Sequence, residues 1–126
     1  YAYTRSGDPN SYLDVYDVGP NGRLESLLGD DTVFTISSQY PIAEPRIDGV
    51  DNNVQATARL VYINTTSTGQ QIEYTNAGQD ARFDMNDQKL TLYQHQGSPQ
   101  VSSLRIAGSL ITFEDNINIY FYSLCA

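Results

Sequence analysis

The stretch 83–92, Phe-Asp-Met-Asn-Asp-Gln-Lys-Leu-Thr-Leu, alternates apolar and polar residues on either side of an Asn-Asp turn signal. Successive side chains of a strand point to opposite faces, so this pattern predicts a β-hairpin. Its predicted core face carries Phe83, Met85, Leu90 and Leu92. Its predicted outward face carries Asp84, Lys89, Thr91 and Tyr93.

The same signals recur along the whole chain. Val, Ile, Thr, Tyr and Phe, which suit a pleated surface, make up 40 of the 126 residues. Strand patterns separated by Gly, Pro, Asn and Asp clusters lie at 12–18, 23–28, 32–37, 54–64, 70–75, 81–85, 89–94, 109–114 and 118–123. Short strands at this spacing predict a single all-β domain over residues 1–126, a compact antiparallel β-sandwich or barrel.

A faint internal duplication adds a β-trefoil as one form of that fold. Residues 13–16 and 60–62 are similar, and each is followed by a glycine and then by an apolar–Glu pair, Leu24-Glu25 or Ile72-Glu73. Three copies of one supersecondary unit would make a trefoil, whereas two ordinary β-meanders would share the same spacing by chance.

Alternation also predicts which side chains face the core in the first and last strands. In the first, Leu13 and Val15 point inward, and Tyr12, Asp14 and Tyr16 point outward. In the last, Ile117, Ile119 and Phe121 point inward, and Asn118, Tyr120 and Tyr122 point outward.

Composition excludes several classes of protein. Fifteen acidic and seven basic side chains leave a formal charge of −8, and the basic set is one Lys with six scattered Arg. Phosphate backbones need clustered positive charge, so the sequence predicts no nucleic-acid partner. No apolar run approaches the ~20 residues of a membrane-spanning helix.

Several features predict a secreted, glycosylated protein of the extracellular space or cell wall. The chain begins at Tyr1 and not Met, as a processed or excised chain would, and the lack of a leader fits its prior removal. Asn64-Thr65-Thr66 is an N-glycosylation triplet in a polar run that predicts an exposed turn. The single cysteine, Cys125, excludes an internal disulfide; it is either a small buried residue or paired with another chain.

The segment 81–93, Ala-Arg-Phe-Asp-Met-Asn-Asp-Gln-Lys-Leu-Thr-Leu-Tyr, followed by Pro99-Gln100, resembles the centre of secreted fungal cell-wall proteins of the PhiA type. The shared pattern is a small residue, an aromatic, an acidic turn, Leu-x-Leu-Tyr and a later Pro-Gln. The resemblance implies a small wall-associated β-rich protein with no established catalytic residues. This chain departs from the family in having one cysteine where the family has several.

Candidate catalytic and metal-binding groups are sparse. His95 is the only histidine, so a two-His zinc motif is impossible, and the Gln-His-Gln-Gly context at 94–97 predicts a turn. Glu25 and Glu73 could form the carboxylate pair of a glycoside hydrolase, although both are predicted to be solvated on strands. The acidic stretches 48–51, 84–87 and 114–116 lack the spacing of a calcium-binding loop and are typical of turns. We therefore predict no catalytic residues, no metal and no cofactor.

Tyrosine is the positive signal, since the chain has ten Tyr and no Trp. The candidate ligand-binding residues are Tyr12, Tyr16, Tyr93, Tyr120 and Tyr122. Their rings could stack on sugars or contact another protein, or they could simply pack between strands. The sequence predicts a non-enzymatic extracellular protein with a structural or interaction role. A carbohydrate-binding module or lectin is the alternative, and the partner is a cell-wall glycan or another extracellular chain.

Overall fold

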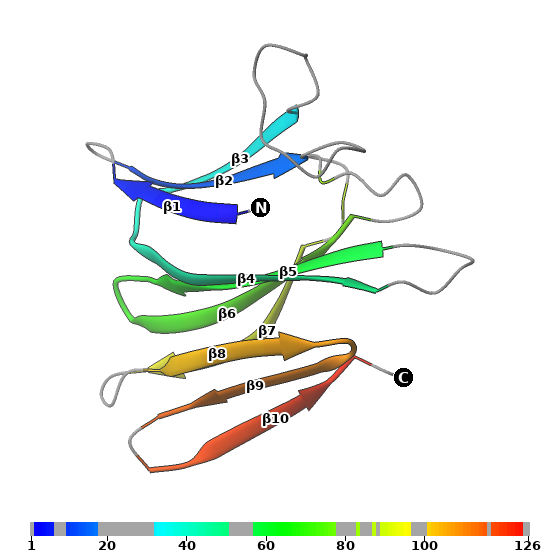
Figure 1. Ribbon diagram of the computed structural model, residues 1–126. Coiled ribbons are helices and arrows are strands. Elements are labelled where there is room, and N and C mark those ends of the chain that lie inside the picture. The colour runs from blue at the N-terminus through cyan, green and yellow to red at the C-terminus, as the bar shows by residue number, and fades with distance from the viewer. Residues whose placement is uncertain are drawn as a thin grey trace.

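The computed structural model describes residues 2–6, 10–17, 32–50, 57–77, 83, 87, 89–96, 101–115 and 117–124. Within these ranges the chain forms ten strands and no helix, which confirms the all-β prediction (Figure 1). The strands are β1 (Ala2–Ser6), β2 (Ser11–Asp17), β3 (Thr32–Ser38), β4 (Ile42–Val50), β5 (Thr57–Thr65), β6 (Gly69–Asn76), β7 (Lys89–Gln96), β8 (Ser102–Ala107), β9 (Leu110–Glu114) and β10 (Ile119–Ser123). In the described part of the chain, no helix long and apolar enough to cross a membrane is found.

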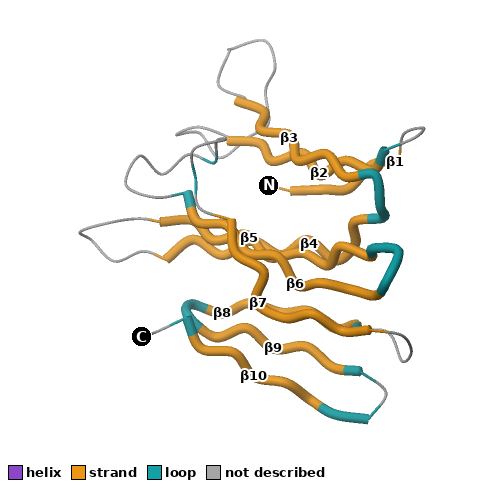
Figure 2. Tube along the Cα trace, turned by 180° about the vertical axis from the view of Figure 1, so that it is seen from behind, coloured by secondary structure: helices purple, strands orange, loops and turns teal. Residues whose placement is uncertain are grey.

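The strands form three antiparallel sheets stacked in layers (Figures 1 and 2). The first sheet has the order β1-β2-β3, the second β4-β5-β6-β7 and the third β10-β9-β8. None of these sheets, as far as the described strands extend, closes into a barrel. The architecture is therefore sandwich-like, and the barrel and trefoil forms of the prediction do not describe it.

The middle sheet is covered on both faces, and β5 explains why. Leu60 and Tyr62 point into one apolar cluster, which contains Leu13, Val15 and Ile36 of the first sheet. The alternate residues of β5, Val61 and Ile63, point into a second cluster, completed by Ile72, Tyr74, Val101, Leu104, Ile111 and Phe113. An unbroken apolar run such as 60–63 is typical of a strand that is buried on both sides.

Polar contacts attach the third sheet to the middle one. Arg46 Nε donates to the Leu104 carbonyl at 3.0 Å, and Arg59 Nη1 donates to the Gly108 carbonyl at 2.7 Å. The Gly108 amide donates in turn to the Asp48 carboxylate. Gly108 has a φ of +58° in the turn between β8 and β9, a conformation that glycine adopts without steric cost.

The sequence predicted β2, β3, β5, β6, β7, β9 and β10, and it missed β1, β4 and β8. β4 contains Pro45 and Gly49, which normally argue against a strand. Pro45 is tolerated because β4 is an edge strand and because an irregularity in its pairing falls between Ala43 and Arg46. The predicted strand 23–28 lies outside the described residues. So does 81–85 except for Phe83, which is not in a strand.

Three predictions for single side chains are wrong: the exposure of Asp14 and the orientations of Tyr93 and Leu90. Asp14 was expected to face solvent but is only 3% exposed, because Thr35 Oγ1 donates to it at 2.7 Å and Arg5 Nε lies 2.5 Å from it. In β7, which pairs with β6, Leu92 and Tyr93 were expected on opposite faces but pack against the same cluster. The reason is an extra residue in β7 at Leu92, which resets the alternation there. Leu90, predicted in the core, is exposed.

Candidate functional site

Two of the candidate tyrosines, Tyr93 and Tyr120, meet between the second and third sheets. Tyr120 stacks on Phe113 with ring centroids 5.1 Å apart, and the Tyr93 ring lies 4.9 Å from Phe113 and 5.1 Å from Tyr120. The Tyr120 hydroxyl donates to Asp115 Oδ2 at 2.9 Å. The pKa of Tyr93 is raised to about 12, first by its hydrogen bond with Tyr120 and next by the partial burial of its hydroxyl. These rings serve the packing of one sheet on another.

Neither Tyr12 nor Tyr122 joins this cluster to form one binding strip. Tyr12 is half-buried on the outer side of the first sheet, where the Arg5 guanidinium lies 4.2 Å from its ring centroid. Tyr122 is 38% exposed on β10, opposite Ile111. The Tyr16 side chain lies outside the described part of the structure. The structure thus brings Tyr93 and Tyr120 together and places Tyr12 on another layer.

The last strand is turned the opposite way from the prediction. Ile117, Ile119 and Phe121, expected in the core, are 77%, 65% and 72% exposed. Tyr120, expected outside, packs against the inner cluster. Alternation fixes which residues share a face but not which face is inside. Here the Phe113 ring and the Asp115 carboxylate offer Tyr120 both an apolar and a polar partner, so Tyr120 packs inward.

This inversion leaves an apolar surface on the outer side of the third sheet. Phe121 lies opposite Thr112 of β9, and Leu110, two residues before Thr112, shares that face and is exposed. Ile119 lies opposite Glu114 on the same side. We refer to Leu110, Ile119 and Phe121 as the β10 apolar face.

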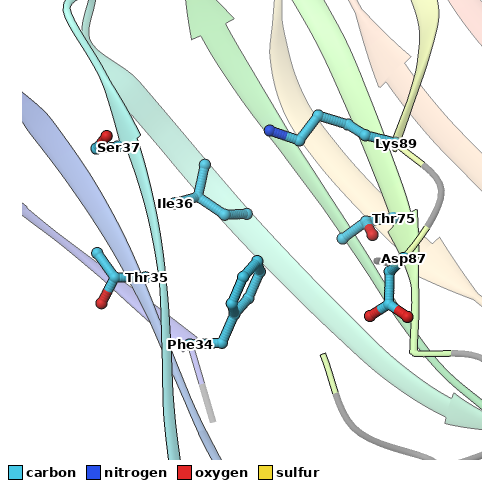
Figure 3. Close-up of a pocket in the computed structure, with 7 residues that line it drawn as sticks. All are labelled: Phe34, Thr35, Ile36, Ser37, Thr75, Asp87 and Lys89. Atoms are coloured by element: carbon cyan, nitrogen blue, oxygen red, sulfur yellow. The ribbon is translucent and has the colours of Figure 1, made fainter. Parts of the chain in front are cut away.

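A cleft of about 300 Å³ opens between the first and second sheets (Figure 3). Phe34 and Ile36 of β3 form its apolar wall, and they point toward Thr75 of β6, Lys89 of β7 and Asp87. One wall can therefore contact an apolar surface while the other offers a hydroxyl, an ammonium and a carboxylate. None of these five residues was predicted as a site, because β3 and β7 are distant in the sequence.

Glu73 lies on the same face of β6 as Thr75, and its predicted solvent exposure is wrong. It is 6% exposed, and Thr91 Oγ1 donates to its two carboxylate oxygens at 2.9 and 3.0 Å. The pKa of the Tyr62 hydroxyl is raised, first because Tyr62 itself is buried and next because of the negative charge of Glu73. Glu25, the proposed second carboxylate of a hydrolase, lies outside the described residues.

Three other residues singled out by the sequence, Asn64, His95 and Asp115, lie in strands or in a turn. Asn64 is half-buried near the end of β5, where Ser38 Oγ donates to its Oδ1 at 3.2 Å. The strand ends at Thr65, so the triplet begins in the strand and the predicted exposed turn follows at 66–68. His95 belongs to β7, so the predicted turn there is wrong. Asp115 Oδ1 accepts from the amides of Ile117 and Asn118, both at 2.7 Å, as a turn carboxylate does. Cys125 lies outside the described part.

No group of three or more His, Cys, Asp or Glu side chains among the described residues is arranged to hold a metal ion. No protein-family model, curated protein or solved structure matches the chain. The β10 apolar face and the cleft are the two surface features of the described structure that bear on function.

Proposed function

We propose that this chain is a secreted, non-enzymatic protein of an extracellular surface such as a cell wall, where it has a structural or interaction role. The observation that carries the proposal is the β10 apolar face. Single exposed apolar residues are common, whereas neighbouring large ones on one sheet face mark a contact site. Ile119 and Phe121 are each about two-thirds exposed or more, and they stand on the same side of one strand.

The arrangement of the buried carboxylates supports a structural role. Asp14 is held by Arg5 and Thr35, and Glu73 accepts from Thr91, so both carboxylates have hydrogen-bond partners within the fold. These contacts link neighbouring strands of the first and second sheets. The resemblance of 81–100 to wall-associated proteins agrees with the same role.

Retention on cell-wall material tests this proposal. The double variant Ile119→Ser with Phe121→Ser should lose most of its binding to insoluble wall polysaccharide or wall protein, because it removes the exposed apolar area without touching the inner clusters. Leu90→Ser is the matched control, since Leu90 is an exposed leucine on a different sheet. Wild-type retention by the double variant would count against the proposal.

A carbohydrate-binding role is the second candidate, and the cleft favours it. Binding sites combine apolar walls with a few polar groups that orient the ligand, and about 300 Å³ is the lower end of their size range. A sugar ring could rest on Phe34 while its hydroxyls reach Thr75, Asp87 and Lys89. This site differs from the tyrosine surface expected from the sequence.

A glycan array followed by calorimetry with the best oligosaccharide tests the cleft. Lys89→Met keeps the aliphatic stem and removes the ammonium, and should weaken binding about tenfold if the charge contacts a hydroxyl or a carboxylate. Lys89→Arg keeps the charge and should retain most of the affinity. Equal affinities for Lys89→Met and the wild-type chain would place the glycan elsewhere.

A further inference from the structure

β10 is the outer strand of the third sheet and is paired with β9 on one side (Figures 1 and 2). Hydrogen bonds from Asp115 N to Asn118 O at 3.0 Å and from Leu124 N to Ser109 O at 2.7 Å continue this ladder at its two ends. Hydrogen-bonded pairs alternate in an antiparallel ladder, so Tyr120 and Tyr122 use their backbone groups toward β9. The backbone N–H and C=O of Ile119 and Phe121 therefore point to the open edge.

The three sheets have six edge strands, and four of them carry features that discourage pairing with another chain. β1 has Arg5, β4 has Pro45 with charged neighbours, β7 has Lys89 and β8 has Arg105. β4, β7 and β8 also contain pairing irregularities, and in β4 and β8 these coincide with positive φ at Glu44 and Ser103. Irregularities of this kind twist an edge away from a flat partner.

β10 carries none of these features. Residues 117–124, Ile-Asn-Ile-Tyr-Phe-Tyr-Ser-Leu, contain no charge, proline or glycine. β3 is also uncharged, but its large side chains Phe34 and Ile36 face the covered side, and its outward side carries Thr35 and Ser37. Judged by the side chains whose burial the structure describes, β10 alone among the edge strands combines an unprotected edge with exposed apolar residues.

We propose that β10 pairs edge to edge with β10 of a second copy of this chain, antiparallel and about a two-fold axis at Phe121. The two three-stranded sheets then become one sheet of six strands. The proposal rests on the proposed function, because it joins the β10 apolar faces of two copies into one larger contact surface. A two-fold contact of this kind is self-complementary and closes at a dimer.

The register that follows is aromatic at every central position. Phe121 lies opposite the partner's Phe121, and Tyr120 lies opposite the partner's Tyr122. Directly opposed aromatic side chains are favourable cross-strand pairs. The β10 apolar faces of the two copies then lie side by side on one surface of the joined sheet.

The edge itself is uncharged, so a second copy of this chain can occupy it. Two copies that each carry a formal charge of −8 repel over most of their surfaces. An eight-residue uncharged segment lets them meet without opposing like charges, which destabilise a strand pair when they lie directly across from each other. An unrelated extended peptide is the competing occupant, and the experiment separates the two.

The test is the mass in solution, by sedimentation up to about 0.5 mM, of the wild-type chain and of charge variants at Phe121. The wild-type chain should show twice the 14.0 kDa of one chain. Phe121→Lys and Phe121→Glu should each weaken self-association by at least about tenfold, because each places like charges across the two-fold axis. Phe121→Leu should remain a dimer. An equimolar mixture of the Lys and Glu variants should restore the dimer, because only a contact through this axis opposes the two residues.

Phe121 is 72% exposed, so these variants should keep the fold, which circular dichroism checks. A wild-type chain that stays at 14.0 kDa overturns the proposal, whether or not it captures an extended peptide. So does a mixture of the charge variants that stays monomeric while the wild-type chain dimerises. Wall retention, measured on the same samples, tests the proposed function separately. If the wild-type chain is a monomer and is retained on the wall, only the β10 pairing is refuted. If it is a dimer and is not retained, only the surface role is refuted.

Discussion

Thr91 donates its hydroxyl to the carboxylate of Glu73 across the ladder between β6 and β7, with Oγ1 2.9 Å from Oε1 and 3.0 Å from Oε2. Thr91 itself is exposed, whereas Glu73 is buried. A buried carboxylate that loses a hydrogen bond keeps the cost of its removal from water. An exposed residue therefore contributes to stability here through a buried neighbour.

Replacing Thr91 by Val should lower the free energy of unfolding by ~1–3 kcal/mol, because the shape is kept and the hydroxyl is lost. Thr91→Ser keeps the hydroxyl and should stay much closer to the wild-type chain. Urea unfolding followed by circular dichroism measures both. If the Val and Ser variants unfold at the same urea concentration, the hydrogen bond contributes nothing to stability.

The inverted orientation of β10 predicts a contrast between two isoleucines. Ile119→Ala should change the free energy of unfolding by ~0.5 kcal/mol or less, because Ile119 is largely exposed. Ile111→Ala should cost ~2–5 kcal/mol, because Ile111 is fully buried on the neighbouring strand. Urea unfolding should be run on dilute protein, so that association does not add to stability. If Ile119→Ala lowers the free energy of unfolding more than Ile111→Ala does, Ile119 lies in the core, as expected from the sequence.

The phenol of Tyr93 should lose its proton at a higher pH than an ordinary tyrosine. A phenol has a pKa near 10 in an unfolded chain, and in the folded protein the pKa of Tyr93 is about 12, chiefly because of its hydrogen bond to Tyr120. The folded state holds the proton more tightly, so this contribution to stability is complete below pH ~10 and is lost as the pH rises toward 12. Tyr120→Phe keeps the ring on Phe113 and removes the hydroxyl, so it should lower the pKa of Tyr93. The ultraviolet absorbance of tyrosinate against pH, with Tyr93→Phe to assign the signal, measures this. An unchanged titration in Tyr120→Phe would contradict the hydrogen bond.

Native material should carry a glycan on Asn64 if the chain is secreted through a glycosylating pathway. The observed hydrogen bond uses Asn64 Oδ1, whereas a glycan is attached through the amide nitrogen, so the two are compatible. Thr66→Ala should abolish the modification, and Thr66→Ser should retain it because Ser keeps the acceptor triplet intact. Peptide mass spectrometry reads the occupancy. Unmodified Asn64 in native material would count against the extracellular proposal.

The sequence predicts strands well where β-branched and aromatic residues alternate between turn signals, as in β2, β3, β5 and β6. It fails where tertiary context overrides a local rule. Pro45 is accepted because its strand lies at an edge, and Leu92 and Tyr93 share a cluster because an extra residue shifts the alternation. Periodicity also cannot choose the inner face of β10, which depends on Phe113 and Asp115 of a neighbouring strand and turn.

Less of the candidate site than of the fold could be predicted from the sequence. Tyrosine composition singled out Tyr93 and Tyr120, but their contact with Phe113 depends on how two sheets pack. The cleft joins Phe34 to Lys89, which come from different sheets and have no local signal in common. A strand was predicted at 118–123, but Ile119 and Phe121 were expected in its core face and are exposed.

The double covering of the middle sheet also sets an order of events during synthesis. Domains emerge from the ribosome N-terminus first, yet Leu13, Val15 and Ile36 of the first sheet pack with Leu60 and Tyr62, which come only with β5. A nascent chain that ends before β5 must hold an uncovered apolar sheet in water. The third sheet, made last, meets a middle sheet already in place. Translation thus exposes the N-terminal half of the chain to aggregation and to chaperones for longer than the C-terminal half.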